Sequence, residues 1–457
     1  MTGTTPFRVG KWLPSDQQVL ERWLDDLIAK ADARGDVPLL PVVEEFRQLI
    51  ERDPEIYMLF AFMLTQAPRK PTPTDEPQVR TVDHMLKLFN HILTHAPEYD
   101  DTGLVGCPIN AILDWAMGTH AGFAAFLNDR VNRQFKKMLN EWGLFLKSAD
   151  SAGVLNDTDS GWFGPKAMAK MPHFAEDFVC DPAKPHYGFT SWDDFFTRRF
   201  RPEVRPVASP ADPDIIVNAC ESAPYRLSHD VRRHDRFWVK GQPYSVAHML
   251  ADDPWAGQFV GGTIYQAFLS ALSYHRWHSP VDGRVVKAHV HDGTYYSEVP
   301  AEGYDPAGPN ESQGYITEVA TRAMVFIEAD NPAIGLMCVL PVGMAEVSTC
   351  EITVYQGQHV KKGDQLGMFH FGGSTHCLMV RPGVRLDFDF RGQTPGLSSS
   401  NIPVNARIAT VVRTGERHLG APWLASCPGR QDRQVRVQHG PRTAPPAAWP
   451  SGAWLCG

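Results

Sequence analysis

The strongest constraint on the fold is a change in sequence pattern near residue 200. Before this point apolar residues recur at helical spacing, as they do from Phe123 to about Leu146. A proline-rich segment, 201–215, follows, and beyond it short runs rich in Val, Ile, Tyr and Thr are punctuated by Gly, Pro and Asp-Gly. We therefore expect an α+β protein, with a helical N-terminal domain over residues 1–200 and a mostly antiparallel β domain over residues 201–412.

Length and charge narrow the class of protein further. The 457 residues exceed the usual size of one hydrophobic core, which favours two domains. The net charge of -8 argues mildly against nucleic acid or an anionic membrane as the main partner. The N-terminus shows no targeting signal, so we expect a cytoplasmic protein. The longest apolar run, Ile56–Leu64, is too short to cross a bilayer and predicts a core helix.

Three further local patterns predict structure. A short helix is expected at Ser191–Phe200, because Ser191 can cap it and Pro202 ends it. The eight cysteines are scattered without a Cys-x-x-Cys pair, which favours reduced thiols over a disulfide framework or a zinc site. From Arg413 onward the chain has no Lys or Ile but six Arg, so we expect residues 413–457 to form a disordered tail.

The first candidate for chemistry is the segment Gly367–Thr375, which reads GMFHFGGST. Two glycines before a Ser-Thr pair commonly make a tight turn between strands. The alternative is that Gly373 lets the backbone bend so that the hydroxyl of Ser374 reaches the preceding carbonyl.

The second candidate is Tyr274–Gly283, which reads YHRWHSPVDG. His275 and His278 could be metal ligands, a catalytic pair or a half-buried structural pair. No third Cys, His or acid stands at ligand spacing, so we expect no metal. Asp282-Gly283 predicts a hairpin turn.

The third candidate is Val217–Ser222, which reads VNACES. A single acid such as Glu221 beside a β run is usually a solvated or capping residue.

Taken together, these segments resemble the phosphatidylserine decarboxylase family. The likeness lies in Leu366–Thr375 (LGMFHFGGST), in YHRWHSPVDG and in Phe195–Pro206 (FFTRRFRPEVRP), and it covers about half of the chain. The helical half, with Thr119–Phe126 (THAGFAAF) and Phe135–Ser148 (FKKMLNEWGLFLKS), is similar to the fungal branch that decarboxylates free L-tryptophan in tryptamine and psilocybin-type pathways.

The resemblance implies a lyase made as a zymogen that cuts itself between Gly373 and Ser374. Ser374 would be the nucleophile and His278 its base, and Ser374 would become a pyruvoyl group, an electron sink for loss of CO2. The products, fragments 1–373 and 374–457, are expected to stay associated. The substrate would be a free aromatic L-amino acid, with L-tryptophan giving tryptamine, and we expect neither a nucleic-acid partner nor a stable membrane association.

The acid of the self-cleaving triad is where this sequence departs from the family. The usual acid stands in a Pro-x-Asp-Gly sequence, whereas Ala219-Cys-Glu-Ser222 holds the matching place here. We assign the acid to Glu221, with Asp282 as its rival. The resemblance gives His275 a part in binding the substrate carboxylate or in handling a proton.

Other interpretations of the same residues remain open at this point. A phosphatidylserine decarboxylase making phosphatidylethanolamine is the nearest alternative. A serine hydrolase that uses Ser374, His278 and Glu221 is a weaker alternative. Another is a lipoyl- or biotinyl-type barrel sandwich, suggested by Gly363-Asp364 and Leu366-Gly367. Trp277, Phe371 and His376 lie near the chemistry in sequence and are candidates for the substrate pocket.

Overall fold

The fold was analysed in a computed structural model of the chain. It describes residues 17–35, 37–67, 79–99, 107–235, 244–269, 273–299, 312–346, 348–370 and 374–413. At Ser374 the description covers the backbone only. Residues 414–457, which include almost all of the expected tail, lie outside the described residues.

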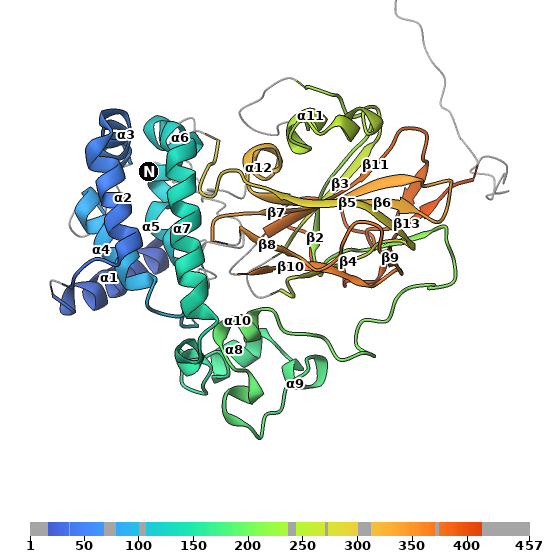
Figure 1. Cartoon of the computed structure of the whole chain (residues 1–457). Helices are drawn as coiled ribbons and strands as arrows, with labels where there is room; N and C mark the ends of the chain where they lie inside the picture. Colours follow the sequence, from blue (N-terminus) through green and yellow to red (C-terminus); the bar gives the residue numbers. More distant parts are fainter. Residues whose placement is uncertain are drawn as a thin grey trace, which may run out of the picture. The chain divides into compact units, whose positions relative to one another are not determined.

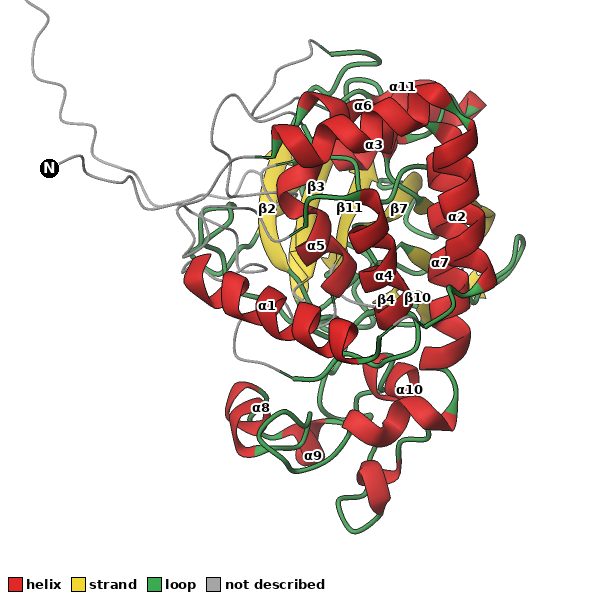
Figure 2. Ribbon diagram, turned by 90° about the vertical axis from the view of Figure 1, so that its left-hand side faces the viewer, coloured by secondary structure: helices red, strands yellow, loops and turns green. Residues whose placement is uncertain are grey.

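Helices make up the first part of the described chain (Figures 1 and 2). The longer ones are α1 (Gln17–Ala33), α2 (Pro41–Arg52), α3 (Pro54–Gln66), α4 (Val82–Ile92), α5 (Pro108–Met117), α6 (His120–Leu127) and α7 (Asp129–Leu146). The apolar run Ile56–Leu64 lies within α3, which confirms the predicted core helix, and Ile56, Phe60 and Met63 are fully buried. The side chain of Asp53 caps α3 by accepting the backbone N–H groups of Glu55 and Ile56.

The apolar stripe from Phe123 to Leu146 belongs to two helices rather than one. Asn128 ends α6, and its side-chain oxygen accepts the backbone N–H groups of Arg130 (2.9 Å) and Val131 (3.3 Å) at the start of α7. Helical spacing carries on across the break, so periodicity alone could not locate it. The cap at Asn128 is the signal that decides the boundary.

Short helices connect this region to the strands. They are η1 (Ala149–Val154), α8 (Pro165–Lys170), α9 (Phe174–Asp177), η2 (Pro185–Gly188) and α10 (Trp192–Phe196). The expected cap of α10 is confirmed, because the hydroxyl of Ser191 accepts the N–H of Asp194. The helix ends at Phe196, earlier than Pro202 alone would require.

The strands form three open antiparallel sheets and, among the described residues, no closed barrel. The large sheet has the order β2-β3-β11-β7-β6-β5-β9, and the two small sheets have the orders β4-β10-β8 and β1-β13-β12. The strands are β1 (Ile215–Val217), β2 (Ala223–Ser228), β3 (Thr263–Leu269), β4 (Arg276–His278), β5 (Gly283–His291), β6 (Arg322–Ala329), β7 (Leu336–Gly343), β8 (Thr349–Ile352), β9 (His359–Val360), β10 (Gln365–His370), β11 (Ser374–Val380), β12 (Leu386–Phe388) and β13 (Arg407–Val411). The predicted α+β class, with its mostly antiparallel sheets, is confirmed.

Both faces of the large sheet are buried. On one face apolar side chains such as Tyr265 and Val339 pack against the small sheets, which contribute Trp277 and Phe369. The other face is covered by α11 (Val246–Met249), η3 (Pro254–Gln258) and α12 (Gln313–Val319). Figure 1 shows α11 and α12 on one side of the large sheet and β4 and β10 on the other.

The predicted hairpin at Asp282-Gly283 is wrong. The strand before it, β4, pairs with β10, whereas the strand after it, β5, pairs with β6 and β9. The chain therefore passes from one sheet to another at this point. Gly283 suits a close approach between strands, because a Cβ atom there would lie 2.5 Å from the carbonyl oxygen of Glu328.

The helices pack directly against the loop that follows β5. The side-chain oxygen of Asn132 on α7 accepts the backbone N–H of Tyr295 (3.2 Å), and Tyr296 packs against Phe126 and Phe135. The described chain up to Arg413 belongs to one compact unit. The division into two domains near residue 200 stays a prediction. Within the described residues, no helix is long and apolar enough to cross a membrane.

The cap between α6 and α7 can be tested by mutation. We expect Asn128→Ala to lower the free energy of unfolding by about 1 kcal/mol, because two N–H groups of α7 lose their acceptor. Urea denaturation of the uncut Ser374→Ala chain measures the change. Asn128→Asp, which keeps an acceptor oxygen, should restore most of the loss, and an equal loss in both variants would contradict the capping role.

Candidate active site

The strand that leads to Gly373, β10, pairs with β4, which ends at His278 and directly follows His275. In the antiparallel register of β10 and β4, Gln365 faces His278 and Met368 faces Arg276. The backbone N–H of Phe369 donates to the carbonyl of His275 (3.0 Å). Two motifs separated by about ninety residues in sequence are therefore joined by backbone hydrogen bonds.

Ser374 is the first residue of β11, in the interior of the large sheet. Its backbone faces Leu269 of β3 on one side and Gly343 of β7 on the other. Residues 371–373, which include the candidates Phe371 and Gly373, lie outside the described residues. The predicted cut thus falls where the chain leaves a small sheet and enters the large one.

The ring of His278 is held at both nitrogens. Nδ1 lies 2.7 Å from the carbonyl oxygen of Gly363, and Nε2 lies 2.8 Å from the hydroxyl of Tyr274. A carbonyl only accepts, so Nδ1 must carry the proton and donate, which leaves Nε2 as the basic nitrogen. Burial lowers the pKa of His278 to about 4, so the ring is neutral near pH 7.

The turn that orients His278 requires a glycine. Gly363 has φ of +88°, and a Cβ atom there would lie 2.5 Å from the side chain of Val207. The turn is fastened to the histidine strand, because the N–H of Gly363 donates to Ser279 O (2.8 Å) and the N–H of Ser279 donates to Asp364 O (2.7 Å). The backbone thus fixes both the position and the tautomer of His278.

Neither predicted acid shares a hydrogen bond with His278 in the structure. Glu221 is 9% exposed, and its carboxylate pairs with the guanidinium of Arg205 (2.9 Å) and accepts the N–H of Val404 (2.8 Å). Asp282 accepts the backbone N–H of Lys362 (2.7 Å). The assignment of the triad acid therefore stays a prediction.

His275 is enclosed by aromatic and cationic side chains. Its ring is fully buried and stacks on Phe196 of α10, with 4.2 Å between the ring centroids. Burial, with a smaller contribution from the charge of Arg198, holds the pKa of His275 well below its ordinary value. The imidazole is therefore neutral, and the helical region supplies part of its surroundings.

The structure places two of the proposed pocket residues in packed surroundings. Trp277 is fully buried against Phe369, and Gly367 gives it room, because a Cβ atom at Gly367 would lie 2.5 Å from the indole. His376 on β11 is also fully buried, and burial lowers its pKa to about 3. Whether either residue touches substrate stays a prediction.

Sequence reasoning missed a buried histidine between two carboxylates. The two ring nitrogens of His370 lie 2.8 Å from Asp193 of α10 and 3.0 Å from Glu351 of β8. Carboxylates accept hydrogen bonds, so each ring nitrogen has an acceptor oxygen within hydrogen-bond distance. His370 stands three residues before Gly373 and ties the end of β10 to the helical region. Its position inside the segment GMFHFGGST could have marked His370 as a candidate for the site.

A buried acid, Glu346, was also missed. It follows β7 three residues after Gly343, the residue that faces Ser374, and its side chain is fully buried. One carboxylate oxygen accepts the N–H of Asn110 at the start of α5 (2.8 Å), whereas the other has no hydrogen-bond partner among the described residues. Burial raises its pKa to about 7. The sequence signal for Glu346 was its place as a single acid just after an apolar strand.

Comparison with known proteins decides the family. A family model described as phosphatidylserine decarboxylase matches residues 192–397, and a second model with the same description matches residues 40–171. An L-tryptophan decarboxylase of Psilocybe cubensis is 39% identical over 415 residues, which cover 85% of this chain and 92% of that protein. The chain belongs to the phosphatidylserine decarboxylase family.

Two other relatives show how the similarity is distributed. Decarboxylase iboD of Amanita muscaria is 46% identical over 301 residues, covering 62% of this chain and 86% of the relative. Phosphatidylserine decarboxylase proenzyme 3 of Schizosaccharomyces pombe is 31% identical over 231 residues, covering 50% of this chain and 22% of the relative.

The chain is therefore a pyruvoyl-dependent carboxy-lyase made as a proenzyme, as the resemblance implied. The position of Ser374 fits a cofactor generated within the chain, because a cut before it would leave the new N-terminus at the start of a strand paired on both sides. The strands β11 and β13, after the predicted cut, pair with β3, β7 and β1 before it. A cut at this position would leave the two fragments joined through shared sheets.

The burial of Glu346 predicts a pH-dependent stability. Its folded pKa of about 7 is raised above the ordinary value of 4.5, so the folded state is favoured at low pH and loses stability as pH rises through this window. Glu346→Gln keeps the acceptor for Asn110 but removes the charge. We expect the free energy of unfolding of the variant, relative to that of the parent chain, to rise by about 2–3 kcal/mol when the pH is raised from about 5 to about 8.

Denaturant unfolding at both pH values in the Ser374→Ala background measures the difference. The exposed Glu328→Gln on β6 serves as the control. If the difference in free energy of unfolding between Glu346→Gln and the parent chain does not change with pH, burial does not disfavour the charged form of Glu346.

Proposed function

We propose that this enzyme decarboxylates a free aromatic L-amino acid, with L-tryptophan as the first substrate and tryptamine and CO2 as products. The observation that carries the proposal is the extent of similarity to a protein named L-tryptophan decarboxylase, which spans 92% of that relative. Similarity to the phosphatidylserine decarboxylase proenzyme covers only half of this chain. The helical region therefore takes part in the match to the amino-acid enzyme.

We further propose that Ser374 cuts the chain at Gly373. The Ser374 hydroxyl adds to the Gly373 carbonyl, the amide nitrogen leaves, and the amide becomes an ester. Loss of the Ser374 α-proton then expels the Gly373 carboxylate and leaves a dehydroalanine. Water enters and ammonia leaves, which completes the pyruvoyl group at the new N-terminus. When present, this group supplies the electron sink for the loss of CO2.

His278 is assigned to the protons of this sequence. Its Nδ1 donates to Gly363, so Nε2 is the nitrogen that can accept the proton of the Ser374 hydroxyl. Its pKa of about 4 keeps it in the basic form at neutral pH. Before it acts, the hydroxyl of Tyr274 must give up its hydrogen bond to Nε2 or relay the proton.

Glu221 remains our choice for the acid. It lies beside the histidine strand, because the N–H of His278 donates to the carbonyl of Ala219, two residues before Glu221 (2.8 Å). Fixed by Arg205 and Val404, its charge would act on the Tyr274–His278 pair rather than through a direct hydrogen bond. His275 is assigned to the substrate carboxylate or to the proton that replaces it.

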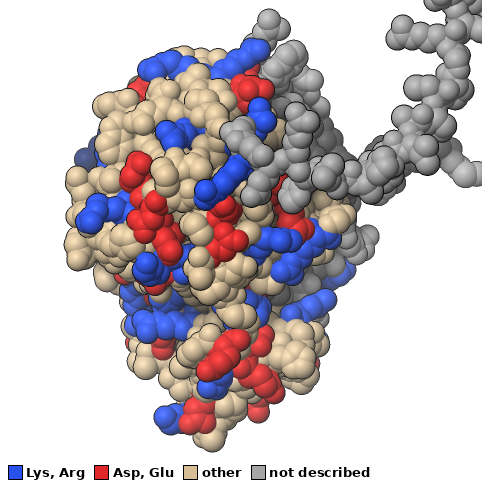
Figure 3. Space-filling model, turned by 90° about the vertical axis from the view of Figure 1, so that its right-hand side faces the viewer, with Lys and Arg blue, Asp and Glu red and all other residues tan. Residues whose placement is uncertain are grey.

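The setting of the enzyme completes the proposal. We propose a cytoplasmic protein without stable membrane association and without a nucleic-acid partner, built from a helical domain and a catalytic domain divided near residue 200. On the face shown in Figure 3, acidic and basic side chains are intermixed. Such a surface does not favour a polyanion over other partners.

The choice of acid is tested by the rate of self-cleavage. We expect Glu221→Gln to slow the appearance of the two fragments by about tenfold or more, and Asp282→Asn to leave the rate within about twofold of the parent chain. Denaturing gels of freshly translated protein follow the cut over time. A larger loss with Asp282→Asn would reassign the acid. Unchanged rates in both variants would mean that Gly363 and Tyr274 orient His278 without either acid.

The substrate is tested on the purified, self-processed enzyme. We expect CO2 and tryptamine from L-tryptophan, at a kcat/KM above that for L-tyrosine or L-phenylalanine, and no CO2 from phosphatidylserine vesicles. Ser374→Ala, which cannot form the pyruvoyl group, provides the blank. Release of CO2 from phosphatidylserine without release from L-tryptophan would overturn the proposal and favour the lipid enzyme.

A further inference from the structure

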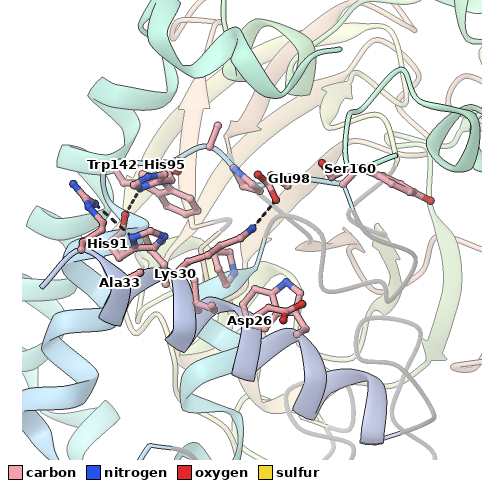
Figure 4. Close-up of a pocket in the computed structure, with 16 residues that line it drawn as sticks. Asp26, Lys30, Ala33, His91, His95, Glu98, Trp142 and Ser160 are labelled. Atoms are coloured by element: carbon pink, nitrogen blue, oxygen red, sulfur yellow. Dashed lines mark hydrogen bonds and ion pairs between the residues drawn. The ribbon is translucent and has the colours of Figure 1, made fainter. Parts of the chain in front are cut away.

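A pocket of about 640 Å³ lies in the helical region, outside the candidate active site (Figure 4). Helix α1 forms one wall, and the end of α4 with the loop after it, His91–Tyr99, forms another. Pro108 of α5, Trp142 of α7 and Ser160 complete the lining among the described residues. The volume is in the range of sites that enclose small ligands. None of the lining residues belongs to β4, β10 or β11.

One side of the pocket presents hydrogen-bond donors. His91 is 8% exposed and stacks on His95 with 4.1 Å between ring centroids, and the guanidinium of Arg34 lies 3.5 Å from its Nδ1. Burial, together with the charges of His95, Arg34 and Lys30, lowers the pKa of His91 to about 4. The neutral ring accepts at Nδ1 and therefore carries its proton at Nε2. Arg34 and His91 together offer donors that suit a carboxylate.

The other side presents acids. Asp26 stands one turn before Lys30 on α1, and Glu98 pairs with Lys30 at 2.9 Å (Figure 4). Both partners of this ion pair are more than half exposed, and such a pair contributes about 0–1 kcal/mol. A ligand ammonium can therefore take the place of Lys30 at little cost.

Between these charged groups the lining is apolar and aromatic. Trp23 and Leu27 contribute from α1, and Ile92, Pro97 and Tyr99 from the opposite wall. A flat aromatic ring gains both burial and ring contacts on such a surface. The lining holds the cations Lys30 and Arg34 together with the acids Asp26 and Glu98, so a ligand that carries both charges meets an opposite charge at each end.

We propose that this pocket is a second, non-catalytic binding site for a zwitterionic aromatic amino acid. The ligand carboxylate meets Arg34 and His91, the ammonium turns toward Asp26 or Glu98, and the ring lies against Trp23 and Leu27. The choice of an aromatic side chain rests on the proposed function, because it gives this site the same ligand class as the substrate. Occupancy would fasten α1 to α4.

The test measures binding of L-tryptophan to the full-length Ser374→Ala chain, in which no turnover occurs. Equilibrium dialysis gives the number of molecules bound per chain. Ala33→Trp fills the pocket, and Ala29→Trp places the same side chain on α1 outside the lining. We expect the number of L-tryptophan molecules bound per chain to fall by one with Ala33→Trp and to stay the same with Ala29→Trp.

A second pair of variants keeps the proposal testable if Ala33→Trp does not fold. Arg34→Ala removes an exposed cation of the pocket just after α1, and Arg22→Ala removes an exposed cation on α1 that does not line the pocket. We expect Arg34→Ala to weaken the second binding event by about tenfold or more, as befits a hydrogen bond to a charged group, and Arg22→Ala to leave it unchanged. Equal stoichiometry and equal affinity within both pairs would overturn the proposal.

The same experiment separates this inference from the proposed function. If the processed parent enzyme fails to decarboxylate L-tryptophan, the proposed function fails. The paired variants still decide whether the pocket binds that amino acid, because the Ser374→Ala chain is assayed without catalysis. If the enzyme decarboxylates L-tryptophan while all four variants bind it alike, only the second site is lost.

Discussion

The pairing of β10 with β4 is the interaction on which the site depends. It brings the strand that leads to Gly373 against β4, which ends at His278 and directly follows His275. The turn at Gly363 then closes the arrangement, because its carbonyl accepts the hydrogen bond from the Nδ1–H of His278 and leaves Nε2 as the basic nitrogen. A side chain at Gly363 would collide with Val207. The tautomer of His278 therefore depends on a glycine at this position.

Burial sets the electrostatic character of the surroundings. His275, His278 and His376 all have lowered pKa values, chiefly because desolvation penalises their charged forms. Glu346, near the residue that faces Ser374, has its pKa raised for the same reason. The buried ring of His370 is flanked instead by the carboxylates of Asp193 and Glu351. The site thus combines neutral imidazoles with a hydrogen-bonded link between the helices and β10.

The sequence could predict the elements and motifs but not all of their partners. Helical spacing, the cap at Ser191 and the β texture after residue 215 are local signals, and the structure confirms the class they predict. The break at Asn128 and the corner at Asp282 were missed because period and turn residues do not say which strand pairs with which. Gly363, Glu346 and Asp193 reach the site through long-range packing, which leaves little trace in local sequence.

The central claim is that Ser374 becomes a pyruvoyl group through a cut at Gly373. Intact mass spectrometry of the purified parent chain under denaturing conditions tests it most directly. The account predicts two fragments, 1–373 and 374–457, with the second lighter than a serine-terminated chain by the mass of one ammonia molecule. A single uncut chain that still decarboxylates L-tryptophan, or a second fragment that begins with an unmodified serine, would contradict it.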